Sequence, residues 1–166
     1  MNTRLCKILL VYSVALFCSL VVINNTTDYD SNFVFVEHVL SMDDTFAGNN
    51  GMWRSITTTW MHHVGYIAII MTEAAIALMC WAGGWKLWCN RSDAVDFNRS
   101  KHLAMVGLTL GFSLWFVGFM VAGGEWFLMW QSSKWNGTES AAHFVIIIGI
   151  IMIFVNTPDV NDPGEG

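Results

Sequence analysis

One carboxylate interrupts an apolar run that is long enough to cross a lipid bilayer. The run extends from Met61 to Trp88, and Glu73 lies near its middle. A spanning helix needs about 20 predominantly apolar residues, and a helical step of about 100° per residue places His62, Tyr66 and Glu73 on one narrow stripe. An ionisable side chain at this depth is costly, so it indicates a partner or a function. We therefore predict an intramembrane polar site at these three residues.

Three interpretations of this site follow from its chemistry. A protonated Glu73 would hold the bundle together through a hydrogen bond to Thr72, Ser113 or another helix. Alternatively, it would contact a partner helix, or it would take part in the passage of a proton or solute. His62 lies about 16 Å from Glu73 along the helix, so water would have to complete a proton chain through Tyr66.

Histidine and carboxylate side chains gather at one predicted end of the bundle. His62 and His63 begin the second span, Glu125 ends the third, and His143 lies one turn into the fourth. These side chains are suitable ligands for zinc, copper or iron, so a metal or haem site is one hypothesis. They show no ligand spacing such as HxxxH, and the competing interpretation is that they bind headgroups and water.

The sequence shows no grouping of a nucleophile, a base and an orienting residue, so no catalytic residues are predicted and an enzyme is not expected. Trp115 and Phe116 in the third span are suited to packing a quinone or a lipid tail, although aromatic residues in such helices are usually core or lipid-facing. We expect no cofactor, with haem, a metal or a quinone as alternatives.

Four apolar stretches define the predicted fold. The chain has 166 residues and is 54% hydrophobic, compared with about 45 to 50% in soluble domains. We predict a single all-α membrane domain over residues 1–158, a four-helix transmembrane bundle, with a disordered tail over 159–166. The predicted spans are approximately 5–25, 61–86, 103–124 and 140–157.

The connection after the first span carries a helical pattern of its own. Phe33, Val36 and Leu40 recur at helical spacing, which predicts a short amphipathic helix on the outer surface. Together with the third connection, this helix would form a partly helical outer, periplasmic cap.

Basic residues indicate the orientation of the spans. Six of the eight Lys and Arg residues lie before the first span or between the second and third, which predicts that both termini are cytoplasmic. The apolar core after Arg4 and Lys7 is longer than that of a signal peptide, so we expect a retained helix. The net charge of -5 argues against nucleic acid as a partner.

Small residues form one face of the third span. Gly107 and Gly111 are a small-xxx-small pair, and Gly118 extends the same face. Such faces let helix backbones approach closely, so we predict that these glycines pack against the second span.

Two long segments carry a family resemblance. The segments NNTTDYDSNFVFVEHVLSMDDTF and WFVGFMVAGGEWFLMWQSSKWNG resemble those of a bacterial family of predicted small integral membrane proteins, a domain of unknown function. The resemblance covers nearly the whole chain. It implies a multi-pass protein of the inner (plasma) membrane of a Gram-negative bacterium, and it implies no activity, cofactor or catalytic residue.

These observations lead to three expectations of function. The first is a non-enzymatic accessory or partner-binding subunit, whose partners are the lipid bilayer and either other membrane subunits or copies of itself. The second is a small redox or proton-handling unit that binds haem, a metal or a quinone. The third is a lipid or small-solute carrier that works as an oligomer.

Overall fold

The computed structural model describes residues 3–161 and contains no β-strand within them. Its long helices are α1 (Thr3–Thr27), α3 (Thr59–Cys89), α4 (Ala94–Ser113) and α5 (Thr138–Asn156). A π-helix, η2 (Leu114–Trp126), continues α4 directly. The four spans α1, α3, α4 with η2, and α5 are each long and apolar enough to cross a membrane. The predicted all-α, four-helix transmembrane bundle is therefore confirmed.

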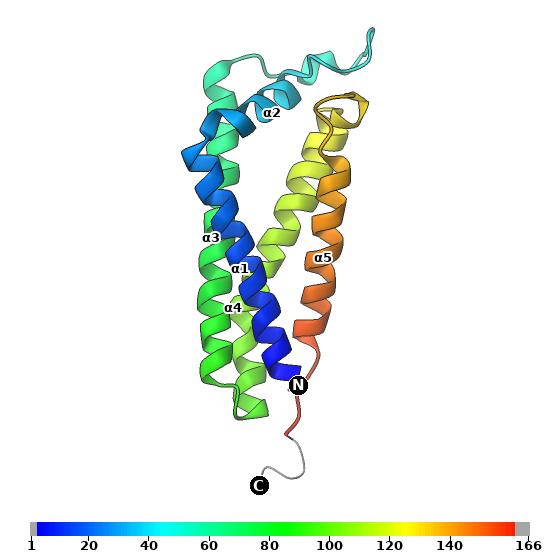
Figure 1. Ribbon diagram of the computed structural model, residues 1–166. Helices are drawn as coiled ribbons and strands as arrows, with labels where there is room; N and C mark the ends of the chain where they lie inside the picture. Colours follow the sequence, from blue (N-terminus) through cyan, green and yellow to red (C-terminus); the bar gives the residue numbers. More distant parts are fainter. Residues whose placement is uncertain (1–2, 162–166) are drawn as a thin grey trace.

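The short helix predicted between the first two spans is α2 (Tyr29–Ser41). It lies across one end of the bundle, opposite the end that carries both termini (Figure 1). Phe33 and Val36 are buried, and Leu40 is half-buried. The chain turns back after α2 through Met42, which has a φ of 57°, and the Ile56 N–H donates to the Leu40 carbonyl at 2.8 Å.

The two connections at the α2 end contact each other. The first contains the short 3-10 helix η1 (Met52–Arg54), and the second contains η3 (Met129–Gln131). The Ser132 hydroxyl donates to Asp44, and this hydrogen bond lowers the pKa of the Asp44 carboxyl. The Phe46 N–H donates to the Gln131 side-chain oxygen at 3.1 Å. The cap is thus a continuous layer made from both connections.

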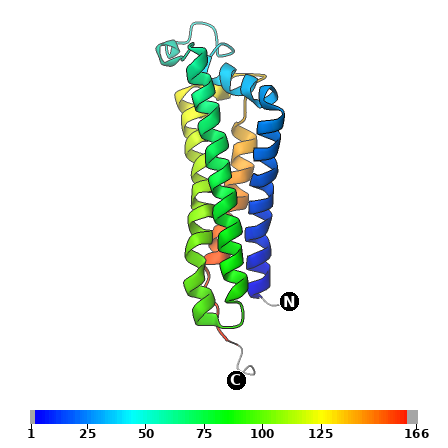
Figure 2. The ribbon, with the colours of Figure 1, turned by 90° about the vertical axis from the view of Figure 1, so that its left-hand side faces the viewer.

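The helices are closely packed near the termini and diverge toward α2. α1 packs on α3, α3 packs on α4, and α5 packs on α4 and η2. At the α2 end, α1 and α3 lie on one side, with η2 and α5 on the other (Figures 1 and 2). The buried stripe of α1 includes Val11, Ala15 and Cys18, and its spacing of three to four residues is typical of a core-facing helix.

Glycines allow α3 and α4 to approach closely in the lower half of the bundle. A Cβ atom at Gly83 would lie 2.5 Å from the Ala104 nitrogen, and one at Gly107 would lie 2.9 Å from the Cys80 sulfur. At Gly111 the nearest atom would be the Ile148 Cδ1 of α5, at 3.4 Å. Of the glycines in the predicted packing face, Gly107 is therefore the one that lies tightly against the second span.

Gly118 is placed differently from the other two glycines of that face. Among the described residues, a Cβ there would meet only Leu114 of its own helix, at 3.6 Å. Gly118 lines an apolar pocket rather than a helix contact. The helices have already diverged at its level, so the backbones are too far apart for a packing role.

A buried ion network joins three parts of the chain at the end that carries the termini. The Asp159 Oδ2 atom accepts hydrogen bonds from Lys7 on α1 and Lys101 on α4, both at 2.6 Å. Both ammonium groups also donate to the Thr157 carbonyl at 2.7 Å. The Asp159 side chain is only 4% exposed. One carboxylate therefore connects α1, α4 and the segment after α5.

This network differs from the disordered tail predicted from residue 159 onward. Asn98 donates to the Asp159 carbonyl at 2.9 Å, and Arg4 donates to the Asn161 side-chain oxygen at 2.7 Å. Residues 159–161 are thus held against the bundle, and residues 162–166 lie outside the described residues. The polar composition of residues 159–166 predicted a disordered tail. The lysines that bind Asp159 are distant in sequence, so the composition of the tail does not reveal them.

Replacing Asp159 with Asn should destabilise the fold. Two ammonium groups would remain buried without a counter-charge, and removing one partner of a buried ion pair costs about 3 kcal/mol or more. The free energy of unfolding in detergent micelles measures this loss. Asp96→Asn is the control, since Asp96 is exposed on the same end of the molecule and should change stability by less than about 0.5 kcal/mol. Equal effects of the two substitutions would contradict a structural role for the network.

The same network gives stability a dependence on pH. Burial raises the pKa of the Asp159 carboxyl, but hydrogen bonds and charge from Lys101 and Lys7 outweigh burial and bring this pKa below its ordinary value of 3.8. A carboxyl whose pKa is lowered by folding stabilises the folded state above its unfolded pKa. This stabilisation should be lost as the pH falls below about 4.

Candidate intramembrane binding site

Glu73 is at the inner end of a chain of hydrogen-bonded polar side chains beneath α2. Its carboxylate is on α3 and is 3% exposed, so the side chain faces the interior of the bundle. The Asn25 side-chain nitrogen, on α1, donates to Glu73 Oε2 at 2.9 Å. Asn32, on α2, donates to the Asn25 side-chain oxygen at 2.7 Å. These two hydrogen bonds connect α3 to α1 and α1 to the cap.

The partner of Glu73 is thus on another helix, and it is neither Thr72 nor Ser113. The Thr72 hydroxyl donates instead to the Ala68 carbonyl of its own helix at 2.7 Å. Among residues 3–161, no hydrogen bond or ion pair reaches the second oxygen of Glu73, Oε1.

Asn25 was not identified from the sequence as part of the site, although a signal was present. Val11 and Cys18 are buried on α1, and Asn25 follows at the same seven-residue spacing. Residues seven apart lie on nearly the same face of an α-helix. An amide that continues a buried apolar stripe indicates a polar partner on the facing helix.

Tyr66 lies two helical turns before Glu73 on the same face of α3. Its side chain is 1% exposed, and the Tyr29 ring contacts it edge-on with ring centroids 4.7 Å apart. The Tyr66 hydroxyl is buried and has no hydrogen-bond partner among residues 3–161. Buried polar atoms are normally hydrogen-bonded. The Tyr66 hydroxyl could therefore bind a polar group of a ligand.

Trp115 presents the second unpaired polar atom. Its ring stacks on Phe144 of α5 with centroids 4.4 Å apart, and Phe119 lies 4.8 Å away. Within the described part of the chain, its indole Nε1 is buried without a hydrogen-bond acceptor. Trp115 is the second residue of η2, and π-helical segments occur frequently at functional sites.

These residues line a cavity of ≈ 350 Å³ between the diverging halves of the bundle. Its polar lining comes from Asn25, Asn32, Tyr66, Glu73, Trp115, Asn136 and Ser140. Phe35, Phe119 and Phe144 supply aromatic walls. Because Asn32, Asn136 and Ser140 are exposed, they mark the mouth, and the buried groups mark the interior.

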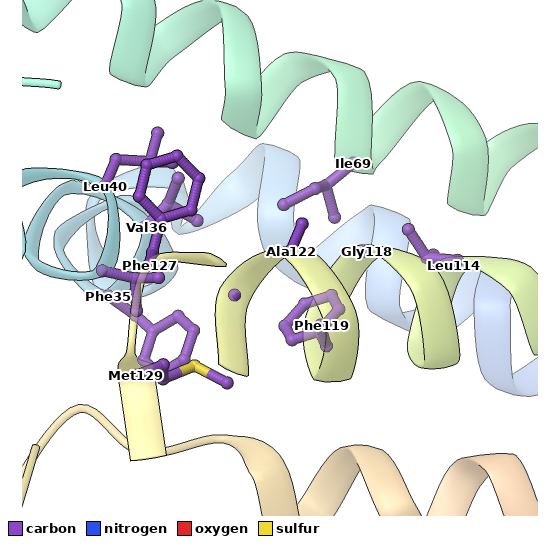
Figure 3. Close-up of a pocket in the computed structure, with 12 residues that line it drawn as sticks. Phe35, Val36, Leu40, Ile69, Leu114, Gly118, Phe119, Ala122, Phe127 and Met129 are labelled. Carbon is purple, nitrogen blue, oxygen red and sulfur yellow. The ribbon is translucent and has the colours of Figure 1, made fainter. Parts of the chain in front are cut away.

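A second, apolar pocket lies against the same aromatic wall. Its volume is ≈ 130 Å³, and α2, α3 and η2 contribute side chains to it (Figure 3). Ile69 on α3 and Ala122 on η2 extend toward each other across it. Phe35, Val36, Ile69 and Phe119 line both this pocket and the polar cavity. The cap and η2 therefore separate a polar compartment from an apolar one.

The four residues considered as metal ligands lie in different surroundings. The His62 Nε2–H donates to the Ile56 carbonyl at 2.7 Å, and His63 stacks on Phe33 with ring centroids 4.2 Å apart. Glu125 and His143 are exposed. Among residues 3–161, no three His, Cys, Asp or Glu side chains form a group that could hold a metal ion. The four residues are at the same end of the bundle, as predicted from the order of the spans, but their side chains do not form a common site.

His62 is also separate from the cavity that contains Tyr66 and Glu73. The His62 Nδ1 atom lies 3.7 Å from the Glu37 carboxylate of α2. Among the described residues that line the cavity, His62 is not included. The predicted stripe therefore divides in two: Tyr66 and Glu73 line the cavity, and His62 attaches α3 to the returning chain.

The fold and site together define a four-span integral membrane protein with a capped cavity inside the bundle. The sequence pattern of the family described as predicted small integral membrane protein, DUF2165, matches residues 3–158. The chain belongs to this family, as the resemblance indicated. Comparisons with curated proteins and with solved structures gave no match.

Replacing Asn25 with Ala should destabilise the α2 end of the bundle. The substitution leaves Glu73 and Asn32 without their shared partner, and an unpaired buried polar group costs about 1 to 3 kcal/mol. The neighbouring residue Asn24 is exposed, so Asn24→Ala is the matched control and should be nearly neutral. Unfolding in detergent, followed by circular dichroism, compares the two variants, and equal stability would show that the hydrogen-bonded chain does not hold the fold.

Proposed function

We propose that this protein is a membrane-embedded binding protein that holds a small molecule in the capped cavity. One observation supports this proposal above the others: a cavity of ≈ 350 Å³ is lined by Glu73, Tyr66 and Trp115. Among residues 3–161, the Tyr66 hydroxyl and the Trp115 Nε1 have no hydrogen-bond partner. Leaving each such atom unpaired costs about 1 to 3 kcal/mol. A molecule that pairs with them would recover part of this free energy.

The composition of the lining favours binding over catalysis. Amide, phenol, indole and hydroxyl groups surround the single carboxylate of Glu73. Such groups orient a ligand by hydrogen bonds, but they do not combine a nucleophile with a base and an orienting group. The volume is at the lower end of the range of about 300 to 1,000 Å³ that is typical of ligand sites. The proposed ligand is accordingly small.

The proposed setting is the inner membrane of a bacterium, with both termini in the cytoplasm. Support comes from the basic residues at the end that carries the termini, which favour the cytoplasmic side. In this orientation the mouth of the cavity at Asn32, Asn136 and Ser140 is on the periplasmic side. The cavity would then receive its ligand from the periplasm or the outer leaflet.

Blocking the mouth should remove the bound molecule. Protein extracted gently from its native membrane should carry a noncovalent small-molecule adduct in native mass spectrometry. Ser140→Phe places a ring at the mouth and should abolish the adduct. Ser133 is also exposed but does not line the cavity, so Ser133→Phe should retain it. Protein without any adduct, or equal adducts in both variants, would contradict the proposal.

A second candidate function is that of an accessory subunit in a larger membrane complex. The α2 end carries an exposed aromatic cluster formed by Phe46, Trp53, Trp126 and Trp130, with exposed fractions between 46% and 74%. Trp53 and Trp126 meet edge-on at 5.7 Å, and the Arg54 guanidinium lies 5.3 Å from the Trp126 ring. Exposed Trp and Arg side chains are enriched at the centres of protein interfaces. The same residues are also suited to the membrane surface.

The subunit role predicts copurification that depends on this cluster. A partner should be recovered at fixed stoichiometry, and Trp53→Ala should reduce its recovery at least tenfold. Trp85 is 63% exposed on α3 outside the cluster, so Trp85→Ala is the control and should retain the partner. Recovery of the wild-type protein as a free monomer after gentle extraction would exclude this role.

A further inference from the structure

We propose that the ligand of the capped cavity is a small organic cation, a protonated or quaternary amine. This inference rests on the proposed function, because it requires that the cavity binds a small molecule. It adds the chemical class of that molecule.

The lining carries a negative group and no positive one. Among the described residues 3–161, Glu73 is the only acidic residue of the lining, and no Lys, Arg or His lines the cavity. Among residues 3–161, no basic side chain lies within ion-pair distance of Glu73. An anionic ligand such as a phosphate or a carboxylate would thus face repulsion or the cost of an unpaired charge. A cation would give the Glu73 carboxylate its missing counter-charge.

Glu73 also has hydrogen-bonding capacity left for a ligand. Asn25 occupies only the Oε2 atom, and a carboxylate group has about four lone-pair sites. The Asn25 amide is fixed in turn by Asn32. The carboxylate is therefore held in position by the protein while one oxygen stays available, which is the arrangement that binds an ammonium group with orientation.

The walls supply the second element of cation recognition. Phe35, Tyr66, Trp115, Phe119 and Phe144 all line the cavity. The face of an aromatic ring is electronegative, and a desolvated cation within about 6 Å of a ring centroid is attracted to it. Trp115 and Phe144 stack at 4.4 Å, so they form a continuous wall. A cavity lined by these rings and by one carboxylate is well suited to an ammonium group with alkyl substituents.

A neutral ligand such as a quinone is less well supported. Its carbonyl oxygens would accept hydrogen bonds from the Trp115 Nε1 and the Tyr66 hydroxyl, but they carry neither a donor nor a positive charge for a Glu73 carboxylate. The purely apolar pocket beyond Phe35 and Phe119 is suited to a hydrocarbon group and holds only ≈ 130 Å³. A long isoprenoid tail would have to leave the protein. Binding of a neutral ligand is therefore the alternative result of the titration with decylubiquinone.

Two probes of nearly identical shape separate charge from size. Choline carries a quaternary nitrogen, and 3,3-dimethylbutan-1-ol has a carbon atom in its place. Titration calorimetry with the full-length protein in a maltoside detergent should show at least tenfold tighter binding of choline. Decylubiquinone serves as the neutral, hydrogen-bond-accepting probe. Equal affinity for choline and the alcohol, or binding of decylubiquinone alone, would overturn the cation proposal and leave the binding site itself standing.

Two carboxylate variants test whether Glu73 is the group that binds the charge. Glu73→Gln keeps the shape of the side chain and an acceptor for Asn25. This substitution should weaken the binding of choline at least tenfold and leave the binding of 3,3-dimethylbutan-1-ol unchanged. Glu37 is 40% exposed on α2 and does not line the cavity, so Glu37→Gln should bind choline like the wild type. Unchanged choline binding in Glu73→Gln would overturn the assignment. Absence of binding by all three probes, together with adduct-free protein, would overturn both the cation class and the binding function.

Discussion

The hydrogen bond from Asn25 to Glu73 is the interaction on which the α2 end of the molecule depends. Polar groups inside a bilayer must find their partners within the protein, because lipid offers none. Glu73 on α3 finds Asn25 on α1, and Asn25 binds Asn32 on α2. Two bonds thus fix the positions of three helices. The cap remains over the bundle because its helix is attached to a polar group that has no alternative partner.

The opposite end is held by charge instead of by amides. Asp159 binds Lys7 and Lys101 at 2.6 Å, and these residues come from the beginning, the middle and the end of the chain. A buried ion pair is only weakly stabilising by itself, but it is costly to break once it is formed. This network therefore specifies which helices meet at that end. Gly83 and Gly107 bring α3 and α4 together at the same end, and the ion network adds α1 and the segment after α5 to this arrangement.

Sequence patterns predicted those features of the fold that depend on a single segment of the chain. Long apolar stretches predicted the four spans, and the spacing of Phe33 and Val36 predicted α2, because hydropathy and helical period are local properties. The stripe marked Glu73 as a candidate polar site, but only the structure shows that the residue is buried inside the bundle. The stripe did not identify its partner, since the pairing of Asn25 with Glu73 depends on how α1 and α3 are aligned along their lengths. The same limitation applies to Asp159, whose lysines lie on two other helices.

The placement of Trp115 shows a different limit of sequence reasoning. An α-helical period extended from Gly107 and Gly111 assigned Gly118 to the same face, but the backbone changes to a π-helix at Leu114. Each turn of a π-helix contains more residues, so side chains beyond this point rotate away from the extrapolated face. Gly118 lines the apolar pocket, and Trp115, the second residue of the π-helix, lines the cavity. No residue in this segment signals the change through hydropathy.

The cavity results from a difference in packing between the two halves of the bundle. Near the termini, Gly83 and Gly107 bring the α3 and α4 backbones together, because any Cβ at these positions would collide with the facing helix. Toward α2, the bulky rings of Trp115 and Phe119 on the same span line the space between the two sides. Since Glu73 lies at the level where the helices diverge, its carboxylate faces the resulting space instead of a packed apolar core.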